Sequence, residues 1–230
     1  TPIAIDTQDK QALVRLEEEG QLGKTVSTLD GLQATKKDLR SLFPGRKPTR
    51  VILSFYCRMI AKKYPRVCFL HEHLYSDAWR PSATTMPGQF RWSTADGWSI
   101  DPEEFDRILW PIEYENVCCL AVVDIGAQEV WLCDSNPNST TKLHNRIFGD
   151  VIRTMNWLLP AANDIWQPRI FSTPVHREGA DSGVIAMHCA YQLTLGLPLT
   201  LPTSVEYVRK RIQLEIMENR LLQRHPAGVR

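Results

Sequence analysis

The stretch "GADSGVIAMHC", residues 179–189, contains the residue types of a nucleophile site. Ser182 follows an aspartate, precedes a glycine and opens a run that is apolar almost all round, which predicts a buried helix. The positive end of a helix dipole favours a developing negative charge on such a side chain. A serine hydroxyl is nevertheless a weak nucleophile at neutral pH unless a general base takes its proton. A turn with a helix cap has the same pattern, so Ser182 alone does not establish catalysis.

The elements that would position Ser182 follow from the spacing of apolar residues. Helical periodicity is found in "SFYCRMIAKKY", "HNRIFGDVIRTMNWLLPA" and "GVIAMHCAYQLTLG". A final helix is predicted to open with a capping box of Thr203 and Glu206. The runs "CCLAVVDI" and "EVWLCDS" predict two core strands, joined by a polar turn in which Gly126 can take a positive φ. The segment "QPRIFSTPV" predicts a further short strand before Ser182.

Length and composition limit the class of protein. The 230 residues, 43% of them hydrophobic, are enough for one sizeable core. We find no repeat or linker and expect a single domain, 1–230, with a core at about 30–222 and an N-terminal extension at 1–29. The start without methionine suggests a fragment of a longer chain.

The expected location is intracellular, nuclear or cytoplasmic. No run approaches the roughly 20 apolar residues that span a bilayer, and no secretion signal is recognisable, so we expect no membrane partner. The six cysteines lack the spacing of a disulfide framework and are expected to be reduced and buried. The net charge of +1 does not favour nucleic-acid binding, and the basic stretch "CRMIAKKYPR" is interpreted as a solvated helix face.

A long excursion rich in Pro, Gly, Ser and Thr spans residues 76–101. It carries three tryptophans that could anchor a protein partner, Trp79, Trp92 and Trp98. Tryptophans in such a segment more often pin it to the body of the protein. The sequence leaves both interpretations open.

A possible zinc site occurs in "CFLHEH", which offers Cys68, His71 and His73. No fourth ligand is evident, and a surface loop has the same composition. We therefore expect no metal and no cofactor.

The order of these segments resembles the ubiquitin-like-protein-specific cysteine proteases, the Ulp/SENP family, over roughly residues 30–220. The similarity rests on "ATKKDLRSLFPG", "RVILSFYCRMI", "WPIEYENVCCLAVVDIGAQEVWLCDS" and "HREGADSGVIAMHCAYQLTLGLPL" taken in order. The resemblance implies an α+β, papain-like cysteine protease fold of the Ulp/SENP type, with a central mixed sheet flanked by helices. It also implies that Ser182 packs beside the hairpin that carries Asp134.

The resemblance assigns four positions to the family's catalytic machinery. Asp134 matches the aspartate that fixes the tautomer of the catalytic histidine. The other three positions differ: Val117 stands at the histidine, His176 at the oxyanion glutamine and Ser182 at the nucleophilic cysteine. Valine cannot accept a proton, so the general base that activates a thiol or hydroxyl is missing from its place.

Two further differences concern the substrate. In the family, two tryptophans roof a narrow tunnel that receives a Gly-Gly tail, and Arg46 and Cys118 stand at their positions here. A charged guanidinium prefers to stay solvated, so the tunnel is expected to be unroofed and the binding of a ubiquitin-like tail to be weak or absent.

The five differences together predict a catalytically inactive, SUMO-protease-like scaffold. Its expected function is that of a non-catalytic interaction module that binds a protein partner through a broad surface, as a subunit of a larger assembly. The alternative is a peptidase for ubiquitin-like conjugates in which Ser182, natural or engineered, replaces the cysteine and His176 or His144 serves as the base.

Overall fold

A computed structural model describes residues 11, 13, 14, 16, 21–70, 104–114, 117–159, 165–175, 178–201 and 204–222. Several residues singled out above lie outside these ranges: His71, His73, Trp79, Trp92, Trp98, His176 and Thr203. Within the described ranges, no helix has the length and hydropathy needed to cross a membrane.

A five-stranded mixed sheet forms the centre of the described fold. Its strands, in spatial order, are β3 (Val67–Phe69), β4 (Arg107–Tyr114), β5 (Val117–Asp124), β6 (Glu129–Cys133) and β7 (Gln167–Phe171). The three central strands are antiparallel, and β3 and β7 run parallel to their neighbours at the two edges. The predicted hairpin is therefore confirmed as β5 and β6.

The turn of this hairpin differs from the prediction. Its positive φ belongs to Gln128, at 54°, and not to Gly126. The carboxylate of Asp124 accepts a hydrogen bond from Ala127 N at 3.0 Å and so stabilises the first part of the turn. The residue with left-handed backbone, Gln128, is the last one before β6.

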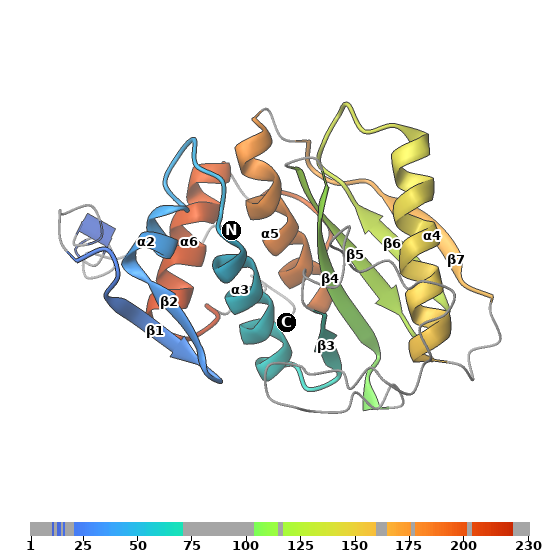
Figure 1. The fold of residues 1–230 in the computed structure, drawn as a ribbon, viewed down its shortest axis with the longest axis horizontal. Helices are drawn as coiled ribbons and strands as arrows, with labels where there is room; N and C mark the ends of the chain where they lie inside the picture. Colours follow the sequence, from blue (N-terminus) through green and yellow to red (C-terminus); the bar gives the residue numbers. More distant parts are fainter. Residues whose placement is uncertain are drawn as a thin grey trace, which may run out of the picture.

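Helices cover both faces of the sheet, as Figure 1 shows. On one face lie α3 (Arg50–Lys63), α5 (Ser182–Thr194) and α6 (Val205–Met217), and on the other lies α4 (Thr141–Leu158). Each face has its own buried cluster, because successive strand residues point to opposite sides. Cys118 belongs to the cluster under α5 and Cys119 to the cluster under α4, and both are buried. The predicted α+β fold with a mixed sheet between helices is confirmed.

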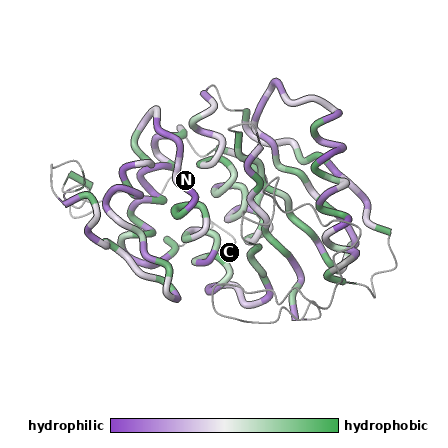
Figure 2. Tube along the Cα trace, in the orientation of Figure 1, coloured by the Kyte–Doolittle hydropathy of each residue, from purple (hydrophilic) through white to green (hydrophobic). Residues whose placement is uncertain are grey.

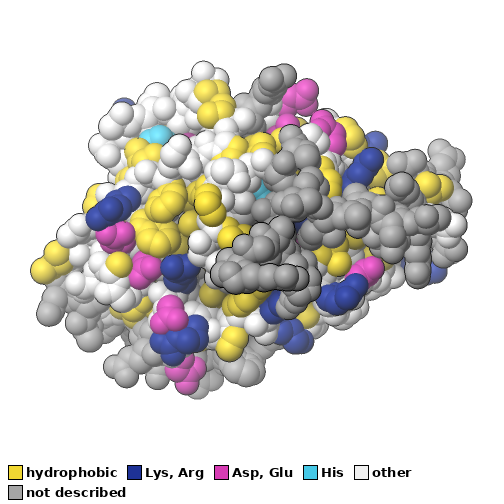
Figure 3. Space-filling model, turned by 180° about the vertical axis from the view of Figure 1, so that it is seen from behind, with side chains coloured by type: hydrophobic (Ala, Val, Ile, Leu, Met, Phe, Trp, Pro, Cys, Tyr) yellow, Lys and Arg dark blue, Asp and Glu magenta, His cyan; other side chains and the backbone are white. Residues whose placement is uncertain are grey.

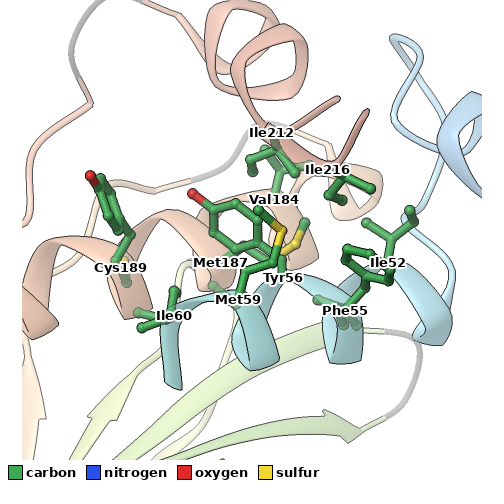
Figure 4. Close-up of a cluster of buried hydrophobic side chains, with 14 of the residues drawn as sticks. Ile52, Phe55, Tyr56, Met59, Ile60, Val184, Met187, Cys189, Ile212 and Ile216 are labelled. Atoms are coloured by element: carbon green, nitrogen blue, oxygen red, sulfur yellow. The ribbon is translucent and has the colours of Figure 1, made fainter. Parts of the chain in front are cut away.

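The larger cluster is formed where three helices meet. Figure 4 shows side chains of α3, α5 and α6 converging, among them Phe55, Met187 and Ile212. Helix α5 is buried along nearly its whole length, as its all-round apolar sequence predicts. In Figure 2 the central strands and much of this helix are green, the colour of apolar residues.

Helix α6 begins one residue later than predicted. Its N-cap is Ser204, whose hydroxyl accepts from Tyr207 N at 3.2 Å, so the proposed capping box of Thr203 and Glu206 is wrong in register. Ser204 has the extended backbone that an N-cap requires.

A small hairpin of β1 (Thr25–Leu29) and β2 (Leu32–Thr35) precedes α2 (Lys36–Arg40). Leu29 and also Leu16 are buried in the core cluster of α3, α5 and α6. The packed part of the chain therefore starts before residue 30, the predicted start of the core.

Candidate functional site

Ser182 is the first residue of α5 and is fully buried. Its Oγ accepts a hydrogen bond from Cys118 N at 3.0 Å and donates to Gly179 O at 2.9 Å. A hydroxyl has one proton to donate. In this structure the proton is donated to the backbone carbonyl of Gly179. The side chain of Ser182 therefore connects the loop before α5 to the start of β5.

The loop that leads into Ser182 is fixed by Arg209 of α6. This guanidinium is only 2% exposed and bonds to Asp181 Oδ1 at 2.6 Å, to Ala180 O at 3.0 Å and to Phe43 O at 3.2 Å. A buried arginine of this kind is compatible with folding only when its donors are paired. Arg209 therefore connects α6 to Phe43 and to the loop before Ser182. The sequence did not predict this function, because Arg209 stands in an amphipathic helix where a polar residue is ordinary.

Asp134 follows β6 and is bonded on several sides. Its Oδ2 lies 2.9 Å from His144 Nε2, and its Oδ1 accepts from Asn136 N at 2.9 Å. The Asp134 side chain is 4% exposed, and that of His144 is 14% exposed. The aspartate thus caps a local backbone donor and binds a histidine from α4.

The hydrogen bonds of Ser182 and those of the His144–Asp134 pair involve different residues. Ser182 is bonded to the backbone of Cys118, whose side chain lies in the cluster under α5, whereas His144 belongs to the helix on the opposite face. Val117 opens β5 and pairs with Tyr114 of β4. The structure places Ser182 next to β5 and Asp134 next to His144. No hydrogen bond between His144 and Ser182 is found among the described residues, so His144 is not positioned as the base of Ser182.

The segment before α3 covers the first turn of α5. A Cβ placed on Gly183 would lie 3.4 Å from Pro48 Cγ, so the proline ring contacts the helix backbone there. Next to it, Lys47 Nζ is hydrogen bonded to Glu113 Oε1, and Arg50 Nε lies 3.0 Å from Glu113 Oε2. Glu113 pairs across the sheet with Cys118. The ion cluster of Lys47, Glu113 and Arg50 is therefore one strand away from Cys118, the residue that stands at one of the two tunnel positions and whose N–H binds Ser182.

Arg46 lies in the same segment but is exposed. Its guanidinium carbon lies 5.8 Å from the ring centroid of Phe43, within cation–π range. The expectation that this guanidinium remains in water agrees with the structure.

The charge state of Glu113 follows from its hydrogen bonds with Lys47 and Arg50. Partial burial raises the pKa of Glu113, but the hydrogen bonds from Lys47 and Arg50 outweigh it and hold the pKa below its usual range. Glu113 is therefore a carboxylate at neutral pH, neutralised by two cations.

Every cysteine whose pKa is shifted has a raised pKa, so none of these thiols is activated. All six are free and buried. Burial raises the pKa of Cys68 to about 12 and raises that of Cys119 well above its ordinary value. Among the described residues, no group of three or more His, Cys, Asp or Glu side chains could hold a metal ion. His71 and His73, the other members of the possible zinc site, lie outside the described ranges.

The fold is that of the Ulp1 SUMO protease catalytic domain. The C-terminal Ulp1 protease domain, solved in complex with Smt3, the yeast ortholog of SUMO, matches with a TM-score of 0.80 at 17% identity, covering 95% of this chain and 97% of that domain. The Ulp1-like SUMO protease catalytic domain of Chaetomium thermophilum matches with a TM-score of 0.76 at 17% identity, covering 97% and 92%.

One similar sequence is that of a Sentrin-specific protease of Caenorhabditis elegans, 25% identical over 209 residues. The match covers 83% of this chain and 28% of the relative, so the chain spans little more than a quarter of that protein's length. No family model matches the sequence. Together, the fold and this similarity support a relationship with the SUMO proteases of the Ulp/SENP type.

Proposed function

We propose that this chain is a non-catalytic protein interaction module on a Ulp/SENP-type protease scaffold. The observation that carries the proposal is the bonding of Ser182: its hydroxyl donates to Gly179 O and accepts from Cys118 N. A serine nucleophile needs its proton directed to a general base, and Val117 stands at the position that the resemblance assigns to that base. Ser182 then has a structural function at the start of α5.

The residues at the two tunnel positions support the same proposal. Arg46 lies on the surface, and Glu113, which pairs across the sheet with Cys118, is bound by Lys47 and Arg50. A partner would then be held by a broad surface with a few anchor residues rather than by its C-terminal tail. On the face drawn in Figure 3, Lys and Arg side chains stand beside Asp and Glu, which favours a protein partner over nucleic acid.

A peptidase for ubiquitin-like conjugates is the second candidate. It is favoured by the name of the Caenorhabditis elegans relative, a Sentrin-specific protease, and by the His144–Asp134 pair, which has the components of a base and its orienting carboxylate. In this case Ser182 would have to leave its two backbone partners during turnover.

The two candidates are separated by incubating the protein with SUMO precursors and with SUMO that carries an electrophilic C-terminal tail. The interaction module gives neither cleavage nor covalent capture with the wild type or with Ser182→Ala. Capture by the wild type that disappears in Ser182→Ala would establish the peptidase.

The binding proposal has its own measurement. A partner isolated by pull-down from the native extract is titrated against the wild type, Ser182→Ala and Asp134→Ala, each checked for folding by circular dichroism. We expect equal affinities within about threefold. Abolished binding in a folded Ser182→Ala variant, or with a partner that lacks its C-terminal glycines, would mean that the old groove is the working site.

A further inference from the structure

The segment that joins α2 to α3 forms a strap, defined here as residues 43–50, over the N-terminus of α5. Both ends of the strap are fixed. Arg209 bonds to Phe43 O at 3.2 Å, and Thr49 N donates to Ser41 Oγ at 3.0 Å while Thr49 Oγ1 bonds to Asp38 Oδ1 at 3.0 Å. The middle, residues 44–46, is exposed and contains Gly45 at a φ of 71°.

The strap is tied across α5 to the sheet by a single acidic residue. Glu113 receives hydrogen bonds from Lys47 and from Arg50, so one carboxylate holds two strap cations. Along the strap, Pro48 is buried and contacts Gly183. Across the sheet, Glu113 is opposite Cys118, whose N–H binds Ser182. The strap therefore contacts the residue next to Ser182 through Pro48, and it is held by a carboxylate opposite the strand residue that binds Ser182.

We propose that the Lys47–Glu113–Arg50 cluster is a latch that keeps the strap closed over Ser182, and that the strap opens locally when this latch is broken. The latch is only partly shielded, because the side chains of Lys47, Glu113 and Arg50 are 33%, 23% and 57% exposed. Ion pairs with this exposure are modest in strength and are screened by salt. The surrounding core is buried, so opening is confined to the strap.

The latch is tested by the rate at which a thiol at position 182 reacts with iodoacetamide. All variants carry Ser182→Cys, and modified peptides are identified by mass spectrometry at low salt. The rate follows the open fraction when opening and closing are faster than labelling. We expect Glu113→Gln to accelerate labelling by about 3- to 30-fold, the effect of two modest ion pairs. The Lys47→Met/Arg50→Gln variant, which breaks the latch from the other side, should do the same.

The matched control is Asp106→Asn. It removes the surface pair of Arg66 with Asp106 at the opposite end of β4, about 23 Å away at the rise of a strand. It should leave the labelling rate unchanged. Sodium chloride at 1 M should accelerate labelling with Glu113 present and have little effect in Glu113→Gln.

Equal labelling rates in the Glu113→Gln and Asp106→Asn variants would overturn the latch. Labelling of the buried Cys57 and Cys189 in step with position 182 would also overturn it, because that pattern means global unfolding. The experiment measures exposure and not turnover, so it is independent of whether the protein is a peptidase.

Discussion

His144 Nε2 lies 2.9 Å from Asp134 Oδ2, and this contact joins α4 to the residue that follows β6. Asp134 occupies the position that the resemblance assigns to a catalytic aspartate, yet its partner comes from the helix on the face of the sheet opposite α5. A carboxylate with only 4% exposure needs such partners, because an unpaired buried charge is costly. The pair therefore has a stabilising function that needs no catalysis.

Removing either member of this pair should destabilise the protein. We expect His144→Ala and Asp134→Ala each to lower the free energy of unfolding by about 1.5–3 kcal/mol, the scale of a hydrogen bond to a charged group. The double variant should lose less than the sum, since both single changes remove the same contact. Urea unfolding measures all three. Arg153→Ala, which breaks an exposed pair with Asp150 on α4, is the control, and its effect should stay within about 0.5 kcal/mol.

Restoring the nucleophile should not restore catalysis. A thiol near its ordinary pKa of about 8.5 is only a few per cent thiolate at pH 7, so Ser182→Cys should react slowly with an electrophilic Gly-Gly probe and cleave no precursor measurably. Adding Val117→His puts an imidazole at the position that the resemblance assigns to the base, and general-base help is typically worth about 10²- to 10⁴-fold. The probe reaction should therefore be faster in the double variant. Efficient cleavage by Ser182→Cys alone would reveal a base that the described residues do not show.

His144 should compete with the introduced base. Because Asp134 Oδ2 already binds His144, adding His144→Ala to Ser182→Cys/Val117→His should increase the probe reaction further. A decrease in the rate would instead indicate that His144 itself takes part in activating position 182.

A buried ion pair between Arg211 and Glu215 lies within α6, and Glu215 also accepts a hydrogen bond from Tyr56 of α3 at 2.7 Å. Arg211 Nε lies 3.4 Å from Glu215 Oε2, and the side chains are 1% and 0% exposed. Burial raises the pKa of Glu215, while the charge of Arg211 and the hydrogen bond from Tyr56 oppose the rise. Arg211→Met should cost about 3–5 kcal/mol of unfolding free energy, because it leaves the carboxylate buried without its cation.

The double change Arg211→Met/Glu215→Met should be less destabilising than Arg211→Met alone. It removes the stranded charge together with its partner, and buried pairs replaced by apolar residues often lose little. Chemical denaturation of the two variants decides this. If the double variant has the lower free energy of unfolding, the ion pair stabilises the fold by more than the free energy needed to bury its two charges.

The latch should weaken in acid. The folded-state pKa of Glu113 lies below its unfolded value, so its contribution is complete above the unfolded pKa of about 4.3 and is lost as the pH falls through the folded pKa. The stability difference between the wild type and Glu113→Gln should be constant above about pH 5.5 and shrink below about pH 4. Urea unfolding at a series of pH values measures it. A difference that grows on acidification would contradict the assigned pairing.

The order of elements around Ser182 was predictable because it depends on short-range patterns. Apolar periodicity predicted α3, α4 and α5, and β-branched runs predicted the hairpin of β5 and β6. The errors were local as well: the N-cap of α6 is Ser204, and the left-handed turn residue is Gln128. The first depends on which of two adjacent hydroxyl residues caps the helix, and the second on how the side chain of Asp124 closes the turn, so composition alone does not distinguish the alternatives.

The bonding of the site was decided by the tertiary structure. The sequence shows which residue types stand at positions 182, 117 and 134, and thereby where the chain differs from the family that it resembles. It could not show that Glu113 binds Lys47, 66 residues away, or that Arg209 binds Phe43 O, 166 residues away. Periodicity reports which side of an element is apolar, but a polar side chain finds its partner only when distant segments pack. For that reason the sequence determined the scaffold and the residue types at its key positions, whereas the fold determined that Glu113 gathers two cations opposite the strand residue that binds Ser182.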